Sequence, residues 1–434
     1  MKKSFLALIN SKYLFVLTSF IWWLVFYPGF YSSDSFGVLI QAKSGPITNI
    51  YTAAWPLTLR VLTIGGRVPG LATLACVLTL SYAVKYFCQN ALPKSSAKLT
   101  TFMLLLTPLV GAMGITLWHD IPMTAGLLIT LSVVIHTSNF KERLDKSEYA
   151  HLFGGALLTS YRPNGLPTLF AFFVFLLLVA RSRSVMKYGS MAVLVALLFS
   201  VITTFMVGQR SLDSPVYAQE WMRSDIACSW ATNSTKIAKD VQDEMERVAP
   251  LTKWDNAAGC TFLNNLGFGS DQVGRSTHLV PAIWFRIFEA DPVDILKIHG
   301  LRNAYLLPIP IIRGMNPPFI QSIIEFPNQG ISYAAPKVVA IFRPYVRAWN
   351  GLRPITAFAG LWLTVLMGLA IFLKQSRKST LPALAMSLAL EGILFAFAPI
   401  PDGRYALLVL IVGQAIAVGF ALDFFFRKRG QKKI

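Results

Sequence analysis

Charged residues are scarce in this chain. They make up 14% of its 434 residues, whereas hydrophobic residues make up 54%. A soluble globular protein carries about 25% charged residues, so this composition excludes that class. The apolar runs are continuous, about 18–20 residues long, and do not alternate with polar residues. They therefore favour membrane-spanning helices over a membrane barrel.

The sequence also lacks the motifs of several enzyme classes. It has no P-loop, no GxSxG and no HExxH, and its 4 cysteines and 5 histidines show no zinc-ligand spacing. The loops that would face the cytoplasm are short and basic. Chemistry on soluble nucleotide sugars in the cytoplasm is thus unsupported.

Acidic residues are few, 21 against 40 basic ones, and unevenly placed. Residues 208–353 hold 13 of them with 15 basic residues, so most of the net charge of +19 lies elsewhere. There it forms short clusters between apolar segments, the positive-inside pattern of membrane proteins, and it does not indicate a nucleic-acid partner.

Placing these clusters in the cytoplasm predicts an all-α polytopic membrane protein. It would have about ten transmembrane helices, both termini inside and a small, mostly helical external domain. The predicted parts are an N-terminal transmembrane module over 1–207, the external domain over 208–353 and C-terminal transmembrane helices over 354–434. The predicted apolar segments are 12–29, 68–88, 100–118, 122–139, 149–161, 165–180, 188–207, 354–373, 381–398 and 405–426. The segment 149–161 is short, which leaves a re-entrant segment open.

This topology places several ionisable residues together on the outer side, where such residues suggest function because they are costly in a membrane. The acids Asp34 and Asp120 are candidate catalytic residues, although each also stands where a helix N-cap is expected. The cations suggest an anion site, because arginine binds phosphate oxygens bidentately. The candidate donor-binding residues are Arg404, Arg162, His119 and Asp402, with Asp402 and Arg404 as a local pair that orients the arginine.

Three further residues need a role. Cys228 and Cys260 are the only cysteines in 208–353, which predicts a disulfide in an oxidising compartment, with two separate thiols as the alternative. Glu391 lies inside a predicted helix, where it either pairs with an arginine or faces a wet cavity.

An external membrane enzyme has no nucleotide triphosphates at hand, so its activated donor would be linked to a lipid. A polyprenyl-phosphate sugar fits, because its tail lies in the bilayer and its phosphate needs cations. One carboxylate would deprotonate the acceptor hydroxyl. Arginine or a divalent metal ion, Mg²⁺ or Mn²⁺, would stabilise the charge on the leaving phosphate. No cofactor is certain from the sequence.

Four motifs resemble those of bacterial membrane glycosyltransferases of the GT-C superfamily, in the same order. They are YPGFYSSDSFGVLIQA, LWHDIPMTAGLL, SYRPNGLPTLF and PDGRYALLVL. The resemblance implies that Asp34 is the base, that Asp120 is a second catalytic or metal-linked acid, and that Arg404 and Arg162 contact phosphate or sugar. The chain departs from the pattern at residues 53–56, where relatives carry His-Pro-Pro, and at His119, where they carry lysine. The first departure puts metal binding by that loop in doubt.

The sequence therefore predicts an inverting GT-C-type hexosyl- or pentosyltransferase at the outer face of a bacterial inner membrane. Its partners would be a polyprenyl-phosphate sugar donor, a surface glycan acceptor such as O-antigen or another cell-wall polymer, and membrane lipids. The alternatives are a transporter or flippase for a lipid-linked or anionic substrate, and an O-antigen polymerase or ligase. The absence of an internal repeat argues against a transporter.

Overall fold

Helices make up most of the described chain. The computed structural model describes residues 13–47, 52–137, 144–180, 183–207, 219–254, 278–303, 332–356, 358–373, 377–397 and 403–431. Within these ranges, β pairing is confined to one isolated parallel bridge between Phe30 and Thr116. The first half contains α2 (Leu14–Val25), α3 (Ser33–Lys43), α4 (Ala54–Leu62), α5 (Pro69–Ala91), α6 (Lys94–Leu106), α7 (Gly111–Gly114), α8 (Asp120–His136), α9 (Lys146–Thr159), α10 (Gly165–Ala180) and α11 (Arg183–Val207). The second half contains α13 (Glu220–Asn233), η2 (Ser234–Lys236), α14 (Lys239–Val248), α15 (Leu251–Trp254), α17 (Leu279–Ala290), α18 (Pro292–Arg302), α20 (Pro336–Gly351), α21 (Arg353–Thr356), α22 (Ala359–Phe372), α23 (Arg377–Phe397), η5 (Gly403–Ala406) and α24 (Leu407–Gln431).

The apolar helices mark the chain as a membrane protein. Among the described residues, α5, α11, α23 and η5–α24 contain 4 stretches long and apolar enough to cross a membrane, and α2, α8, α10 and α22 are shorter apolar helices. Each of the ten apolar segments predicted from the sequence contains a helix. A count of about ten membrane crossings remains a prediction.

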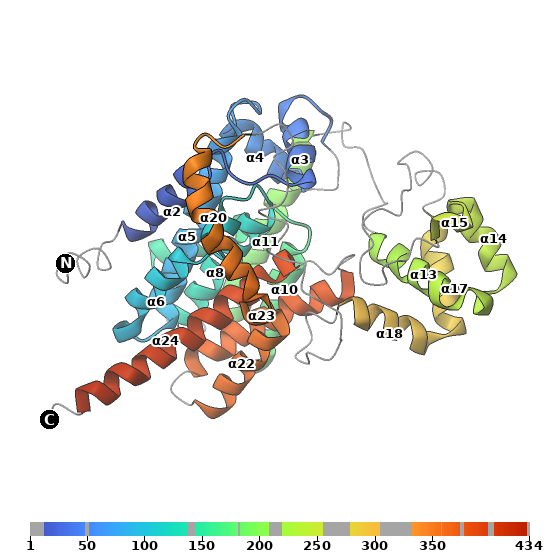
Figure 1. The fold of residues 1–434 in the computed structure, drawn as a ribbon. Helices are drawn as coiled ribbons and strands as arrows, with labels where there is room; N and C mark the ends of the chain where they lie inside the picture. The colour runs from blue at the N-terminus through green and yellow to red at the C-terminus, as the bar shows by residue number, and fades with distance from the viewer. Residues whose placement is uncertain are drawn as a thin grey trace.

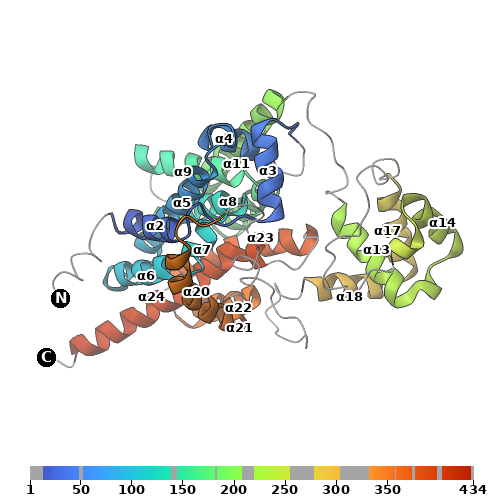
Figure 2. The same ribbon diagram turned by 45° about the horizontal axis from the view of Figure 1, so that its top comes forward.

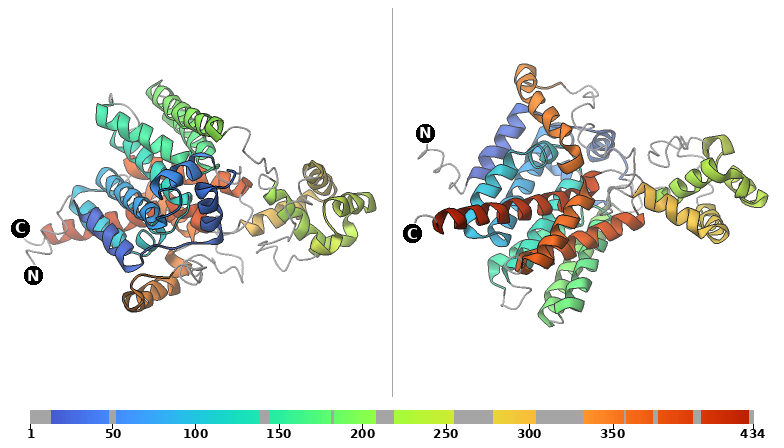
Figure 3. Two further views of the ribbon diagram at one scale, coloured as in Figure 1. Left: turned by 90° about the horizontal axis from the view of Figure 1, so that it is seen from above. Right: turned by 60° about the horizontal axis from the view of Figure 1, so that its bottom comes forward.

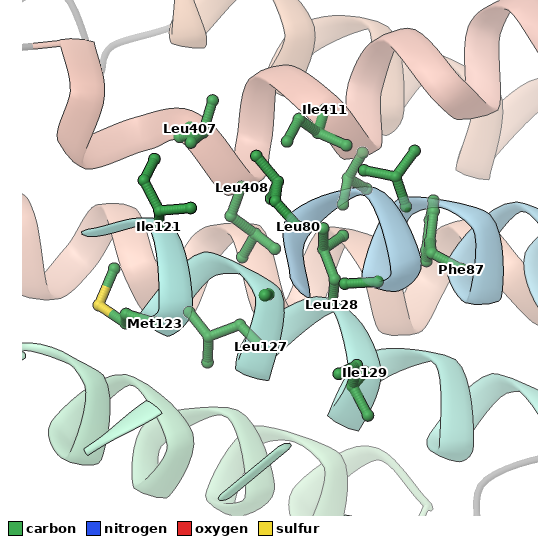
Figure 4. Packing of buried hydrophobic residues seen from close by; sticks show 14 of the residues in the cluster. Leu80, Phe87, Ile121, Met123, Leu127, Leu128, Ile129, Leu407, Leu408 and Ile411 are labelled. Carbon is green, nitrogen blue, oxygen red and sulfur yellow. The ribbon is translucent and has the colours of Figure 1, made fainter. Parts of the chain in front are cut away.

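The bundle packs around α8. Every residue of α8 from Asp120 to Ile135 is buried, because the helix is apolar on all sides and neighbours surround it. Figure 4 shows this packing, with Leu80 of α5 and Leu408 of α24 against the α8 side chains. In the tilted view of Figure 2, α8 again lies inside the bundle.

Glycines let α8 and α9 approach each other at backbone distance. A Cβ atom on Gly126 would lie 2.5 Å from the carbonyl oxygen of Gly155, and one on Gly155 would lie 2.6 Å from Thr130 Oγ1. Small residues at such crossings are how membrane helices associate, since lipid supplies no hydrophobic driving force. The close contact brings the start of α8 beside the turn that follows α9.

A second, smaller core lies beside the bundle. Helices α13 to α18 enclose it, with Trp254, Met245 and Ile283 fully buried. Figures 1 and 3 show this unit at one end of the bundle, away from the start of α2 and the end of α24. In contrast, Val339 and Val346 of α20 belong to the bundle core. The described part of segment 208–353 is thus divided between two cores.

Candidate active site

Hydrogen bonds join two loops that are far apart in the sequence, the loop before α3 and the loop before α8. The backbone N–H of Phe30 donates to Ile115 O at 3.0 Å, and the N–H of Leu117 donates to Phe30 O at 3.0 Å. The indole Nε1 of Trp118 donates to Ser32 Oγ at 2.7 Å. These bonds fix the start of α3 against the segment that leads into α8.

The structure decides how α3 begins. Ser32 is the N-cap, and it forms a capping box in which its hydroxyl accepts from Ser35 N and Ser35 Oγ accepts from Ser32 N. Ser35 Oγ also donates to Leu117 O at 2.9 Å. Asp34 is therefore not the cap, and its carboxylate is left for another role.

Asp34 instead pairs with an arginine from the other end of the chain. Arg404 Nη1 lies 2.8 Å from Asp34 Oδ2, and the guanidinium lies over the rings of Trp118 at 4.7 Å and Tyr405 at 5.2 Å. The side chain of Asp34 is 37% exposed, whereas that of Arg404 is 10% exposed. The carboxylate thus remains accessible from outside while aromatic faces hold the arginine in place.

Asp120 pairs with Arg162 in a buried contact. Asp120 begins α8, and its side chain is fully buried against Arg162 Nη1. The N-cap residue is His119, which makes no side-chain cap hydrogen bond, so Asp120 is not a cap either. The guanidinium of Arg162 lies over the Tyr405 ring at 4.0 Å. A buried carboxylate needs such a partner, because an uncompensated charge there is strongly destabilising.

The ring of Tyr405 joins the two pairs, since both guanidiniums lie over it. We call Asp34, Arg404, Asp120 and Arg162 the double ion pair. Its formal charge is zero, with one carboxylate accessible and the other enclosed. All four residues were predicted from the sequence, and the structure brings them together at one place.

His119 is buried beside this cluster. Burial, with the positive charges of Arg162 and Arg404, lowers the pKa of His119 well below its usual range. The imidazole is therefore neutral at neutral pH. A neutral ring adds no charge to a site that already holds two guanidiniums.

The arrangement does not fit a divalent metal ion. Among the described residues, no three His, Cys, Asp or Glu side chains are grouped as metal ligands. Both carboxylates of the site face guanidiniums, which would repel a divalent cation and already compensate the carboxylate charge. We derive no step through Mg²⁺ or Mn²⁺.

Some predicted residues fall elsewhere. Asp402 and Cys260 lie outside the described residues, so the Asp402–Arg404 pair and the Cys228–Cys260 disulfide stay predictions. Cys228 is buried in α13, and Cys76 and Cys88 are buried free thiols.

Glu391 is buried in α23, and its Oε1 has no hydrogen-bond partner in the described part of the chain. An arginine partner, one of the two alternatives that the sequence left open, is not seen among the described residues.

The sequence reasoning missed three residues of the site. Trp118 and Tyr405 supply the ring faces under the arginines, and Ser32 accepts from Trp118. The sequence offered one clue to the two aromatic residues. Trp118 and Tyr405 lie in the motifs LWHD and DGRY, directly beside candidate site residues.

Comparison with known proteins adds little to this geometry. No protein-family model matches the chain, and no curated protein is significantly similar to it. Among solved structures, the chain is similar to the archaeal oligosaccharyltransferase AglB from Archaeoglobus fulgidus, solved with an inhibitory peptide and a dolichol-phosphate. The TM-score is 0.43 at 13% identity, and the match covers 97% of this chain and 52% of that one. The chain thus spans about half the length of that neighbour, and a likeness this low carries no argument about function.

Proposed function

We propose that the chain is a membrane glycosyltransferase of GT-C type. It would move a hexose or pentose from a polyprenyl-phosphate donor to a cell-surface glycan, such as O-antigen or another cell-wall polymer. The double ion pair carries the proposal, because it joins an accessible carboxylate to two stacked guanidiniums at one end of an apolar bundle.

The guanidiniums favour a phosphate-bearing substrate. Arginine presents its N–H groups in a planar fork that matches phosphate oxygens, and the rings of Trp118 and Tyr405 set the plane of that fork at Arg404. The neighbouring helices are apolar and suit a lipid tail. A lipid-linked sugar phosphate satisfies both features.

The exposure of the two carboxylates separates their roles. Asp34 is 37% exposed, so an acceptor hydroxyl can reach it, whereas Asp120 is fully enclosed. We assign Asp34 as the general base and Asp120 as the residue that holds Arg162.

The transfer step follows from this assignment. The acceptor oxygen bonds to the anomeric carbon, the bond from that carbon to the phosphate oxygen breaks, and the hydroxyl proton passes to Asp34. The leaving polyprenyl phosphate takes the electron pair, and Arg404 stabilises its charge.

Donor binding would also free the base. In the structure the guanidinium of Arg404 is bound to the carboxylate of Asp34. When the donor phosphate enters, Arg404 can exchange Asp34 for phosphate oxygens. The order donor first, acceptor second follows from this exchange of partners.

The location of the site completes the proposal. The helices α13 to α18 stand at the end of the bundle away from the start of α2 and the end of α24 (Figure 1). We propose that this end faces outward from a bacterial inner membrane, with both termini in the cytoplasm. We propose that residues 208–353 form the external part of the chain and that its α13–α18 unit selects the acceptor, while α20 packs on the bundle.

A transfer assay tests the proposal. Purified protein in lipid nanodiscs is incubated with membrane glycan and a radiolabelled polyprenyl-phosphate hexose or pentose, in parallel with the diphosphate-linked sugars. We expect transfer from a monophosphate donor and a loss of at least about tenfold in Arg404→Gln. Arg427→Gln is the matched control, because Arg427 pairs with Asp423 near the end of α24.

Other outcomes point to other classes. Transfer from the diphosphate donors alone would indicate a polymerase or ligase. Movement of donor across vesicles without transfer would indicate a transporter. Neither activity with any lipid-linked donor would refute the proposed enzyme.

A further inference from the structure

A buried histidine contacts both the unit formed by α13 to α18 and the bundle. His299 of α18 is buried, and its two ring nitrogens contact different parts of the molecule. Nδ1 lies 3.1 Å from Asp225 Oδ2 in α13, and Nε2 lies 2.6 Å from the carbonyl oxygen of Phe395 in α23. His299 thus links the smaller core to the bundle.

Both ring nitrogens of His299 face hydrogen-bond acceptors, a carboxylate and a backbone carbonyl. Phe395 lies in the last turn of α23, where carbonyl groups lack partners within the helix. Asp225 is fully buried and receives a second bond from Trp284 Nε1 at 3.0 Å.

Neighbouring residues strengthen the same junction. Asn303 Nδ2 also donates to Phe395 O, at 3.1 Å, and Asn303 is fully buried. The ring of Trp221 meets His299 edge-on at 5.9 Å and Phe397 at 6.2 Å. Two side chains, His299 of α18 and Asn303 just after it, therefore bind one carbonyl oxygen of α23. We call His299, Asn303 and Asp225 the α18 lock.

The lock holds the end of a helix that packs against the site. Its acceptor, Phe395, is in the last turn of α23, and α23 packs against η5, which carries Arg404 and Tyr405. A shift of this helix end would move Arg404 relative to Asp34, its partner at 2.8 Å.

We propose that His299 is a positioning residue: it locks the α13–α18 unit onto the end of α23 and so holds Arg404 at the site. The lock stands on its own contacts, whereas its effect on donor binding rests on the proposed function. The α13–α18 unit and the site are then mechanically coupled, so an acceptor that binds to this unit would affect the position of Arg404.

Hydrogen exchange of the full chain in nanodiscs tests the lock without any substrate. In His299→Phe, which keeps a ring but removes both ring nitrogens, we expect amides at the end of α23 and in η5 to exchange about tenfold faster. Amides of α14 should be unchanged. Lys297→Gln, an exposed position on the same helix, is the matched control and should match wild type.

Transfer kinetics separate positioning from simple loss of fold. Misplacement of Arg404 should raise the donor KM about tenfold in His299→Phe with a smaller change in kcat. If His299→Phe does not fold, Asp225→Asn keeps the shape and removes the charge that holds Nδ1, and it should show the same pattern at reduced size.

Each outcome decides the matter. Unchanged exchange in α23 and η5, or equally faster exchange in every helix, overturns the lock. A fall in kcat at constant KM overturns the positioning role. The exchange pattern without any sugar transfer by wild type would leave the lock standing and refute the proposed function.

Discussion

The accessible carboxylate of the double ion pair allows a demanding test through Asp34→Asn. The amide keeps the shape of the side chain but cannot take the hydroxyl proton. Loss of a general base lowers kcat by about 10²–10⁴-fold, which at about 1.36 kcal/mol per tenfold corresponds to roughly 3–5 kcal/mol of transition-state stabilisation.

The donor KM should fall as well. The donor phosphate must displace Asp34 from Arg404, which lies 2.8 Å away. Two unit charges at contact interact by about 4 kcal/mol at an effective dielectric of 20, but the 37% exposure of Asp34 reduces the net value to about 1 kcal/mol or less. Removing the carboxylate charge should therefore lower the donor KM by up to about fivefold.

The assay measures initial rates of radiolabelled transfer over a range of donor concentrations. Asp423→Asn is the control, because Asp423 forms a carboxylate–arginine pair with Arg427, Nε to Oδ2 2.9 Å, near the end of α24. An Asp34→Asn variant with normal kcat and a raised KM would show that Asp34 only orients Arg404, and the base assignment would be wrong.

Three further predictions concern stability. Arg162→Gln leaves the buried Asp120 unpaired and should lower the free energy of unfolding by about 3–5 kcal/mol. The double variant Asp120→Asn with Arg162→Gln should recover most of that loss in thermal-unfolding measurements. Equal losses in the single and double variants would contradict the pairing. Gly155→Ala places a Cβ 2.6 Å from Thr130 Oγ1 and should cost about 1–3 kcal/mol by the same assay, while Gly154→Ala, with nothing within 4 Å, should be neutral. The pKa of His119 is lower in the folded chain than in the unfolded chain. As the pH drops below about 6.5, the unfolded chain therefore takes up a proton that the folded chain does not bind, and the free energy of unfolding should fall. His119→Gln should flatten that slope, and an unchanged slope would show that another group causes it.

Several features of the site were predictable because they depend on local composition. Asp34 and Asp120 stand out in a chain whose apolar segments carry few acids, and the basic clusters assign both to one side. The rival role of each as a helix cap could not be settled that way. It depends on which hydroxyl reaches the first free N–H groups, and in α3 that residue is Ser32.

The sequence did not establish which carboxylate pairs with which arginine. The sequence predicted Asp402 as the local partner of Arg404, which stays a prediction because Asp402 lies outside the described residues. Within those residues Arg404 pairs with Asp34, from the opposite end of the chain. Hydrogen bonds between the Phe30 and Leu117 segments bring Asp34 there. Such contacts join segments that no local pattern connects.

The sequence by itself determined that the chain is a bundle of apolar helices and which few ionisable residues stand at the ends of those helices, because hydropathy and charge act residue by residue. Only the tertiary structure decided which carboxylate faces which guanidinium, that Trp118 and Tyr405 lie under the arginines, and that His299 joins the smaller core to α23. These depend on how closely helices approach. Gly126 and Gly155 allow a close approach because neither has a Cβ atom. The sequence does not show which helix faces each glycine, so this effect can be recognised only in the packed structure.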